Sequence, residues 1–159
     1  MPRTLIIGYG NPLRGDDAAG CIAAYELEQR FHDDPEVEVI TAQQLTPEMV
    51  DDVARSRFVL FIDASWGDEP GTIRQTQVEP DATPYGFTHH VTPASLLAGA
   101  EQLYGDAPPG VCITVAGWSF ELSNKLSRGL RLRLPELVRQ AAEIVNAERG
   151  ANAVGSAPG

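Results

Sequence analysis

The stretch TLIIGYGNPLRGDDAAG, residues 4–20, passes from an apolar run through a glycine-rich turn into a helical pattern. Residues 3–7 predict a short strand, and residues 17–30 carry apolar side chains at helical spacing. The turn between them closes on two adjacent carboxylates, Asp16 and Asp17. A turn of this kind either binds a nucleotide or positions the carboxylates, and the two interpretations predict different functions.

The rest of the chain continues the alternation of strand and helix. Strands are predicted at 36–40, 57–64, 71–78 and 110–117, and helices at 47–55, 93–104 and 135–148. Thr46-Pro47 and Thr92-Pro93 each predict a helix start, and Gly105 predicts a stop. The strand at 71–78 follows its predecessor too closely for a parallel crossover, so we expect it to be an antiparallel neighbour or edge.

This pattern predicts one α/β domain over residues 1–149 and a disordered tail over 150–159. The expected fold is a three-layer sandwich, in which a mixed, mostly parallel twisted sheet of about five strands carries helices on both faces. The runs at 57–64 and 110–117 are continuously apolar, as in strands covered on both sides. Ligands of such sheets collect beyond the carboxyl ends of the strands.

Composition excludes several classes of partner. The 159 residues include 12 basic and 22 acidic side chains, a net charge of −10. No basic patch offers an electrostatic footprint for nucleic acid, and an anionic membrane surface would repel the chain. The first apolar run is too short for a signal peptide, so we expect a cytoplasmic protein. Cys21 and Cys112 are expected to be small buried residues rather than a disulfide or metal pair.

Reactive side chains follow three separate segments at the expected ligand-binding edge. Asp16 and Asp17 follow the first strand, Asp63 ends the strand at 57–64, and His89-His90 precede the helix at 93–104. Two carboxylate oxygens and one imidazole nitrogen suit a borderline divalent ion such as zinc or nickel. Each residue also has an ordinary structural explanation. An aspartate can cap a helix or a turn, and the histidines can lie in a solvated loop.

The glycine turn fits a nucleotide site poorly. Leu13 stands where a dinucleotide fingerprint needs its third glycine, no acid follows the strand at 36–40, and no Gly-Lys-Ser/Thr is present. Asn11 can satisfy local backbone groups and Gly15 permits a positive dihedral before the helix, so the turn suits tight turning that aims an aspartate. The sequence also lacks the G-x-S-x-G and H-E-x-x-H motifs of other hydrolases.

Three motifs, in order, resemble those of the nickel-iron hydrogenase maturation endopeptidases, over residues 3–148. GYGNPLRGDDAAG resembles the opening signature of that family, FIDA with PGTIR its second acidic segment, and FTHHVTP its Thr-His segment. The resemblance implies that Asp17, Asp63 and a histidine bind metal. His89 matches the family spacing, and His90 is the alternative.

Such proteins remove a C-terminal extension from a hydrogenase large subunit after nickel insertion. The resemblance therefore implies that the precursor is the partner, that the nickel arrives with it, and that no cofactor is permanently bound. Asp17 and Asp63 would be catalytic, one of them orienting the attacking water while the ion polarises the scissile carbonyl. We expect a monomer.

The substrate cleft is expected to include Gly10, Asn11, Asp16, Gln43 and Gln44. TAQQLTPE stands where many members carry an acidic, glycine-rich loop, so the two glutamines would line the cleft in its place or serve as turn residues. A non-catalytic assembly chaperone, a nucleotide-binding module and a metalloamidase with its own metal are the alternatives.

Overall fold

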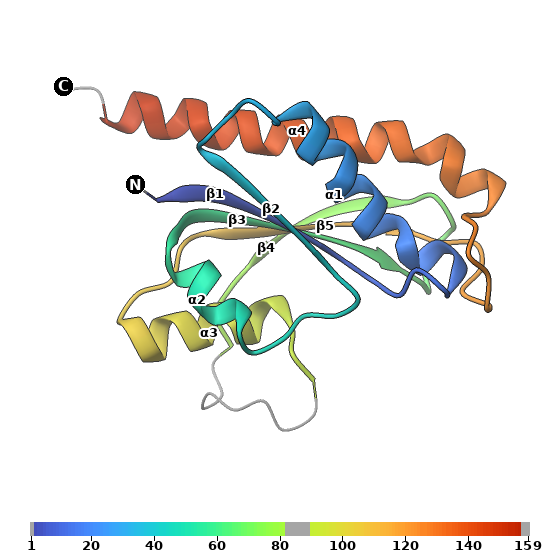
Figure 1. Cartoon of the computed structure of the whole chain (residues 1–159), viewed down its shortest axis with the longest axis horizontal. Helices are drawn as coiled ribbons and strands as arrows, with labels where there is room; N and C mark the ends of the chain where they lie inside the picture. The colour runs from blue at the N-terminus through green and yellow to red at the C-terminus, as the bar shows by residue number, and fades with distance from the viewer. Residues whose placement is uncertain (1, 82–89, 157–159) are drawn as a thin grey trace.

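The computed structural model describes residues 2–81 and 90–156, and a five-stranded sheet lies at its centre (Figure 1). Its strands lie in the order β2-β1-β3-β5-β4. The first four of these are parallel, and β4 pairs antiparallel with β5 at one edge, as the short connection predicted. The bounds are β1 Arg3–Tyr9, β2 Val37–Ala42, β3 Ser56–Ser65, β4 Ile73–Val78 and β5 Gly110–Ala116.

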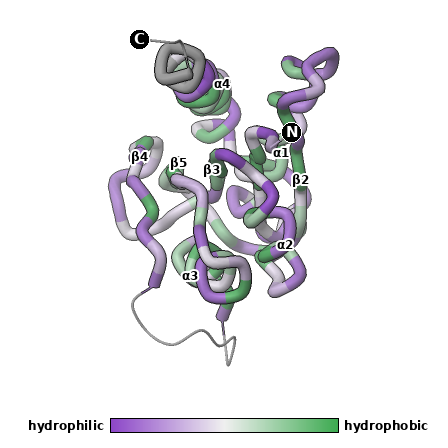
Figure 2. The backbone as a smooth tube through the Cα atoms, turned by 90° about the vertical axis from the view of Figure 1, so that its left-hand side faces the viewer, coloured by the Kyte–Doolittle hydropathy of each residue, from purple (hydrophilic) through white to green (hydrophobic). Residues whose placement is uncertain are grey.

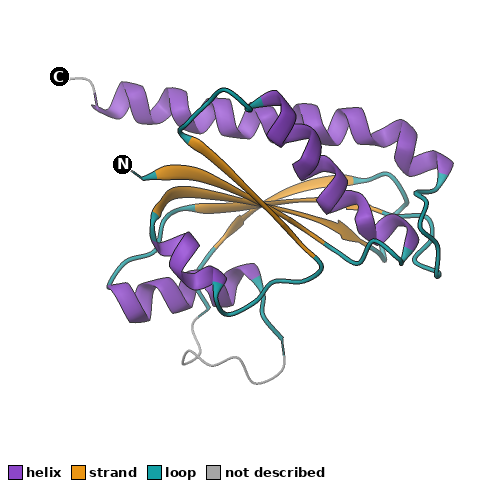
Figure 3. Ribbon diagram, viewed as in Figure 1, coloured by secondary structure: helices purple, strands orange, loops and turns teal. Residues whose placement is uncertain are grey.

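Helices cover both faces of this sheet, which confirms the predicted three-layer sandwich (Figure 3). On one face lie α1 (Ala19–Arg30) and α4 (Arg128–Ser156), and on the other lie α2 (Met49–Ala54) and α3 (Pro93–Tyr104). Across the described residues, no helix is long and apolar enough to cross a membrane.

The two helical layers enclose two separate cores, because successive side chains of a strand point to opposite faces. Ile6 and Leu60 pack in the core beneath α1 and α4. Leu5, Ile7 and Phe61 pack in the core beneath α2 and α3. Both faces of the central strands are therefore covered, which explains the uninterrupted apolar runs at residues 5–7 of β1 and 58–62 of β3. Figure 2 shows the hydropathy along the backbone.

Two of the predicted helix starts are displaced toward the C-terminus. A short 3-10 turn, η1 (Gly15–Ala18), precedes α1, which begins at Ala19. The helix α2 begins at Met49, because Thr46 and the two residues after it form a turn in which the Met49 amide donates to the Thr46 carbonyl at 3.1 Å. The start of α3 is as predicted, since Thr92 and Ser95 form a reciprocal capping box.

The last helix is longer than predicted. It begins at Arg128, contains Pro135 in its interior and continues to Ser156. The buried side chains of Leu130 and Leu137, on either side of the proline, hold the helix against the sheet despite the missing amide donor. Residues 150–156, assigned from the sequence to a tail, continue this helix.

A close approach between α1 and the sheet sets the geometry of the predicted site. A Cβ atom added at Gly20 would lie 2.4 Å from the carbonyl oxygen of Ile62 and 2.6 Å from that of Tyr9. Only a glycine allows the first turn of α1 to lie this close to the ends of β1 and β3. The turn that carries Asp17 is thereby held next to the end of β3, which carries Asp63.

Candidate active site

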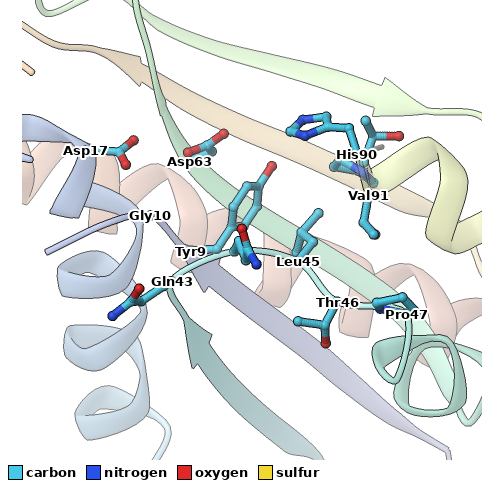
Figure 4. A pocket seen from close by; sticks show the side chains of 13 residues that line it. Tyr9, Gly10, Asp17, Gln43, Leu45, Thr46, Pro47, Asp63, His90 and Val91 are labelled. Atoms are coloured by element: carbon cyan, nitrogen blue, oxygen red, sulfur yellow. The ribbon is translucent and has the colours of Figure 1, made fainter. Parts of the chain in front are cut away.

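The carboxylates of Asp17 and Asp63 lie side by side at the carboxyl edge of the sheet (Figure 4). Asp63 belongs to β3, and Asp17 belongs to the turn η1 that follows β1, the parallel neighbour of β3. Both residues are half-buried and line a cleft of about 620 Å³ together with Tyr9 and His90. The topology therefore brings two residues 46 positions apart to one wall, as the strand order requires.

The environment of Asp63 favours the protonated carboxyl group. Burial, together with the nearby charge of Asp17, raises the pKa of Asp63 from 3.8 to about 7. Hydrogen bonds from the Ala64 amide and the Tyr9 hydroxyl oppose this rise in the pKa. Burial and the charge of Asp63 also raise the pKa of Tyr9, so its hydroxyl stays a hydrogen-bond donor. A carboxyl group that titrates near neutrality is suited to proton transfer.

The glycine turn directs its own backbone amides inward. The Gly10 amide donates to the Ala42 carbonyl at 3.1 Å, and the Asn11 amide donates to Oδ2 of Asp17 at 2.7 Å. The Leu13 amide donates to the Asn11 side chain at 2.9 Å, and each amide of residues 14–17 donates to a carbonyl oxygen. A phosphate cradle needs free amides. The turn instead positions Asp17.

Gly10 is needed where this turn meets Asp17. Its φ is 149°, and a Cβ atom at this position would lie 1.9 Å from the Asp17 carbonyl oxygen. Any larger residue would therefore displace the segment that carries Asp17.

Asp16 does not line the cleft, contrary to expectation. Its side chain is completely buried on the other side of η1, and its carboxylate accepts four hydrogen bonds. The donors are the amides of Trp118 (2.7 Å), Ser119 (3.2 Å) and Ser127 (2.7 Å), and the hydroxyl of Ser127 (2.8 Å). Two adjacent carboxylates thus point in different directions, and Asp16 holds the segment between β5 and α4 in place.

The remaining predicted cleft residues lie near the carboxylate pair. Gly10, Gln43 and Gln44 line the cleft described above. Asn11 lines a second cleft of about 550 Å³, which also includes Asp17 and Asp63. The two clefts therefore meet at the carboxylates.

The structure describes only one of the two candidate histidines. His90 lies across the cleft from Asp63, on the segment before α3 (Figure 4). His89 lies outside the described residues. Within residues 2–81 and 90–156, no group of three His, Cys, Asp or Glu side chains is close enough to hold a metal ion. The structure thus brings together Asp17 and Asp63 of the predicted metal-binding set.

Sequence reasoning missed the residues that surround the carboxylates. Tyr9 lies between the two glycines of the turn, and Trp66 follows Asp63 by three positions, but neither belongs to a motif that indicates a role. Cys112 lies near Asp63, and burial and that charge raise the pKa of its thiol to about 12. Both thiols are free and partly buried, and Cys21 donates a hydrogen bond to the Ala42 carbonyl.

Comparison with known proteins places the chain in a family. No protein-family model matches it. A protein of Methanocaldococcus jannaschii named a "putative hydrogenase maturation protease" is 32% identical over 151 residues, which cover 91% of this chain and 94% of that protein. The chain belongs to the hydrogenase maturation protease family. It is therefore a protease, a hydrolase of peptide bonds.

Solved structures of hydrogenase maturation proteases share the fold. HybD from Escherichia coli superposes with a TM-score of 0.74 at 23% identity, over 92% of this chain and 93% of HybD. HycI from Thermococcus kodakarensis, a [NiFe] hydrogenase maturation protease, superposes with a TM-score of 0.69 at 25% identity, over 91% and 92% of the two chains. The similarity extends over nearly the whole α/β domain.

Proposed function

We propose that this hydrogenase maturation protease removes the C-terminal extension of a nickel-iron hydrogenase large-subunit precursor after nickel has been inserted. Two half-buried carboxylates, one in β3 and one in the turn that follows its parallel neighbour β1, meet at the junction of two clefts. This observation carries the proposal. A polypeptide that crosses this junction places a peptide bond beside groups able to activate water. Family membership supplies the class of reaction.

Asp17, Asp63 and one histidine recognise the nickel that the precursor carries. Carboxylate oxygen and imidazole nitrogen are ligand types that nickel accepts, and the remaining positions belong to the precursor. His90 is placed across the cleft from the carboxylates, which supports a role for this segment of the chain. His89, the histidine that matches the family spacing, is the first choice for the third ligand.

One of the two carboxylates orients the attacking water. The unequal surroundings of the pair support this division of roles, because Asp63 titrates near pH 7 while Asp17 accepts a hydrogen bond from the Asn11 amide. Two carboxyl groups in different environments can take different roles in one reaction. Nickel bound to the precursor would polarise the scissile carbonyl.

The test is an incubation of the purified protein with nickel-loaded and nickel-free precursor, followed by intact mass spectrometry. We expect the loss of a C-terminal fragment from the nickel-loaded form alone. Asp17→Asn and Asp63→Asn variants are the matched controls, and neither should release the fragment while both keep the circular dichroism spectrum of the parent.

Three other results would revise the proposal in different ways. Cleavage of both precursor forms would keep the protease and remove the nickel check. Binding without cleavage, across several candidate precursors, would favour an assembly chaperone. Normal cleavage by both aspartate variants would show that the reaction takes place elsewhere.

A further inference from the structure

The second cleft has a different lining from the first. The first is lined by polar and apolar side chains alike, including Gln43, Gln44 and Leu45, whereas the second is more apolar and contains the aromatic side chains of Trp66 and Phe120. Its remaining lining residues are Asn11, Arg14, Asp17, Asp63 and Ala64. Because Asp17 and Asp63 belong to both clefts, the second is a continuation of the candidate active site on the other side of the carboxylates.

Trp66 is unusually exposed for its size. It follows β3 directly, and 83% of its surface is accessible to solvent. Tryptophan is normally well buried, because its large apolar surface is costly to hydrate. None of the residues that the structure describes buries the indole ring, so most of its apolar surface is available for contact with a bound partner.

Other exposed apolar side chains gather at the same edge of the sheet. The segments that carry them are adjacent, since the Ser123 amide donates to the Leu13 carbonyl at 2.9 Å and the Gly15 amide donates to the Ser123 carbonyl at 2.9 Å. Half of the large exposed apolar residues in the described part of the chain follow β1, β3 or β5, namely Leu13, Trp66, Trp118 and Leu122. Contiguous exposed apolar surface marks sites of protein contact.

Arg14 provides the cation in the lining of the second cleft. Its side chain is exposed and makes no hydrogen bond or ion pair with any described residue. In a protein of net charge −10, an arginine left without an acidic partner beside two carboxylates is available to an acceptor oxygen of a bound chain.

We propose that the second cleft binds the precursor polypeptide on one side of the scissile bond, through a large apolar side chain packed against Trp66 and Phe120. This inference rests on the proposed proteolytic function and adds a specificity-determining subsite to it. A chain cut at the carboxylates must leave the junction in two directions. The first cleft holds one segment, and the more apolar second cleft, with Trp66 and Phe120, holds the other.

The test compares processing by two exposed-residue variants. Trp66→Ala should lower kcat/KM for the nickel-loaded precursor by about tenfold or more, mainly through KM, because exposed tryptophans at protein interfaces contribute strongly to binding. Trp66→Phe should retain most of the parent value. Leu103→Ala is the control, because Leu103 is also exposed, at 59%, but lies near the far end of α3 from the cleft. It should stay within about twofold of the parent, as expected of a residue outside the interface.

Parent-like kinetics of Trp66→Ala would overturn the subsite and leave the protease assignment intact. If the parent protein does not cleave, hydroxyl-radical footprinting with the bound precursor still gives an answer. Protection of Trp66 but not of Leu103 would support the second cleft as the contact surface. Equal oxidation of Trp66 with and without precursor would reject it.

Discussion

Asp16 and Asp17 show how much adjacent residues can differ in their roles. The first is completely buried and accepts hydrogen bonds from the segment after β5, while the second is half-buried and faces Asp63. One peptide unit of rotation in a 3-10 turn is enough to send the two carboxylates to opposite sides. At the scale of single residues, function therefore depends on direction rather than on residue type.

The raised pKa of Asp63 makes the stability of the protein depend on pH. The pKa of this carboxyl group is about 7 in the native state, whereas its ordinary pKa, taken for the unfolded state, is 3.8. Between these values the native state holds a proton that the unfolded state has released, so the free energy of unfolding falls as pH rises from about 4 to about 7. Asp63→Asn removes this titration and should increase the free energy of unfolding at pH 8 by about 1 to 3 kcal/mol.

Urea unfolding of the parent and of Asp63→Asn, each at pH 5 and pH 8, measures this effect. The gain of the variant over the parent should be larger at pH 8 than at pH 5. An equal difference at the two pH values would mean that burial does not perturb the carboxyl of Asp63 in the native state.

Elements far apart in the sequence are tied together at the site by a few polar contacts. The carboxylate of Asp16 joins η1 to the segment between β5 and α4 through the amides of residues 118, 119 and 127. Gly20 then lets α1 lie against the ends of β1 and β3. These two features hold in place the turn that carries Asp17, but neither takes part in the proposed reaction itself.

Alanine substitutions at positions 16 and 17 should separate the two roles. Asp16→Ala leaves buried amides without an acceptor and should lower the free energy of unfolding by about 3 to 5 kcal/mol. Asp17→Ala removes a half-buried group with one amide donor, so its cost should be about 1 kcal/mol, with loss of processing.

Thermal or urea unfolding together with the precursor assay compares the two variants. Asp16→Ala should still process the precursor at a temperature where it remains folded. Equal destabilisation by the two substitutions would contradict the separate roles of these neighbouring carboxylates.

At the scale of the whole molecule, the sheet order places the candidate active site at one edge of the sheet, where two clefts meet. The central position of β1 and β3 brings Asp17 and Asp63 together, and the segments after β2, β3 and β5 surround them. The protein as a whole is acidic, and its described residues bring two carboxylates, but no group of three potential metal ligands, to the cleft.

The proposal that nickel comes with the precursor predicts that the free protein holds little of it. The proposed site is completed by ligands of the precursor, and the described residues alone bring two carboxylates to it, so the dialysed protein should retain roughly a tenth of an equivalent of nickel or less. Elemental analysis by plasma mass spectrometry measures this content, with Asp63→Asn as the comparison. One full equivalent in the parent, lost in the variant, would instead favour a metalloamidase with a resident metal.

The sequence by itself determined the strand and helix pattern, the mixed sheet with its antiparallel edge and the candidate pair of Asp17 and Asp63. Apolar periodicity and turn residues are local signals, and the carboxyl ends of neighbouring parallel strands meet wherever such a sheet forms. The sequence likewise distinguishes the glycine turn from a nucleotide-binding motif, because residues that such a motif requires are missing.

Only the tertiary structure decided the roles of the residues around that pair. The burial of Asp16 depends on amides 102 to 111 positions away, and the environment that raises the pKa of Asp63 depends on the packing of β1 against β3. The meeting of two unlike clefts at the carboxylates likewise joins segments after several strands. Such contacts are long-range, and no local pattern in the sequence encodes them, because they arise only when the strands are assembled in their final order.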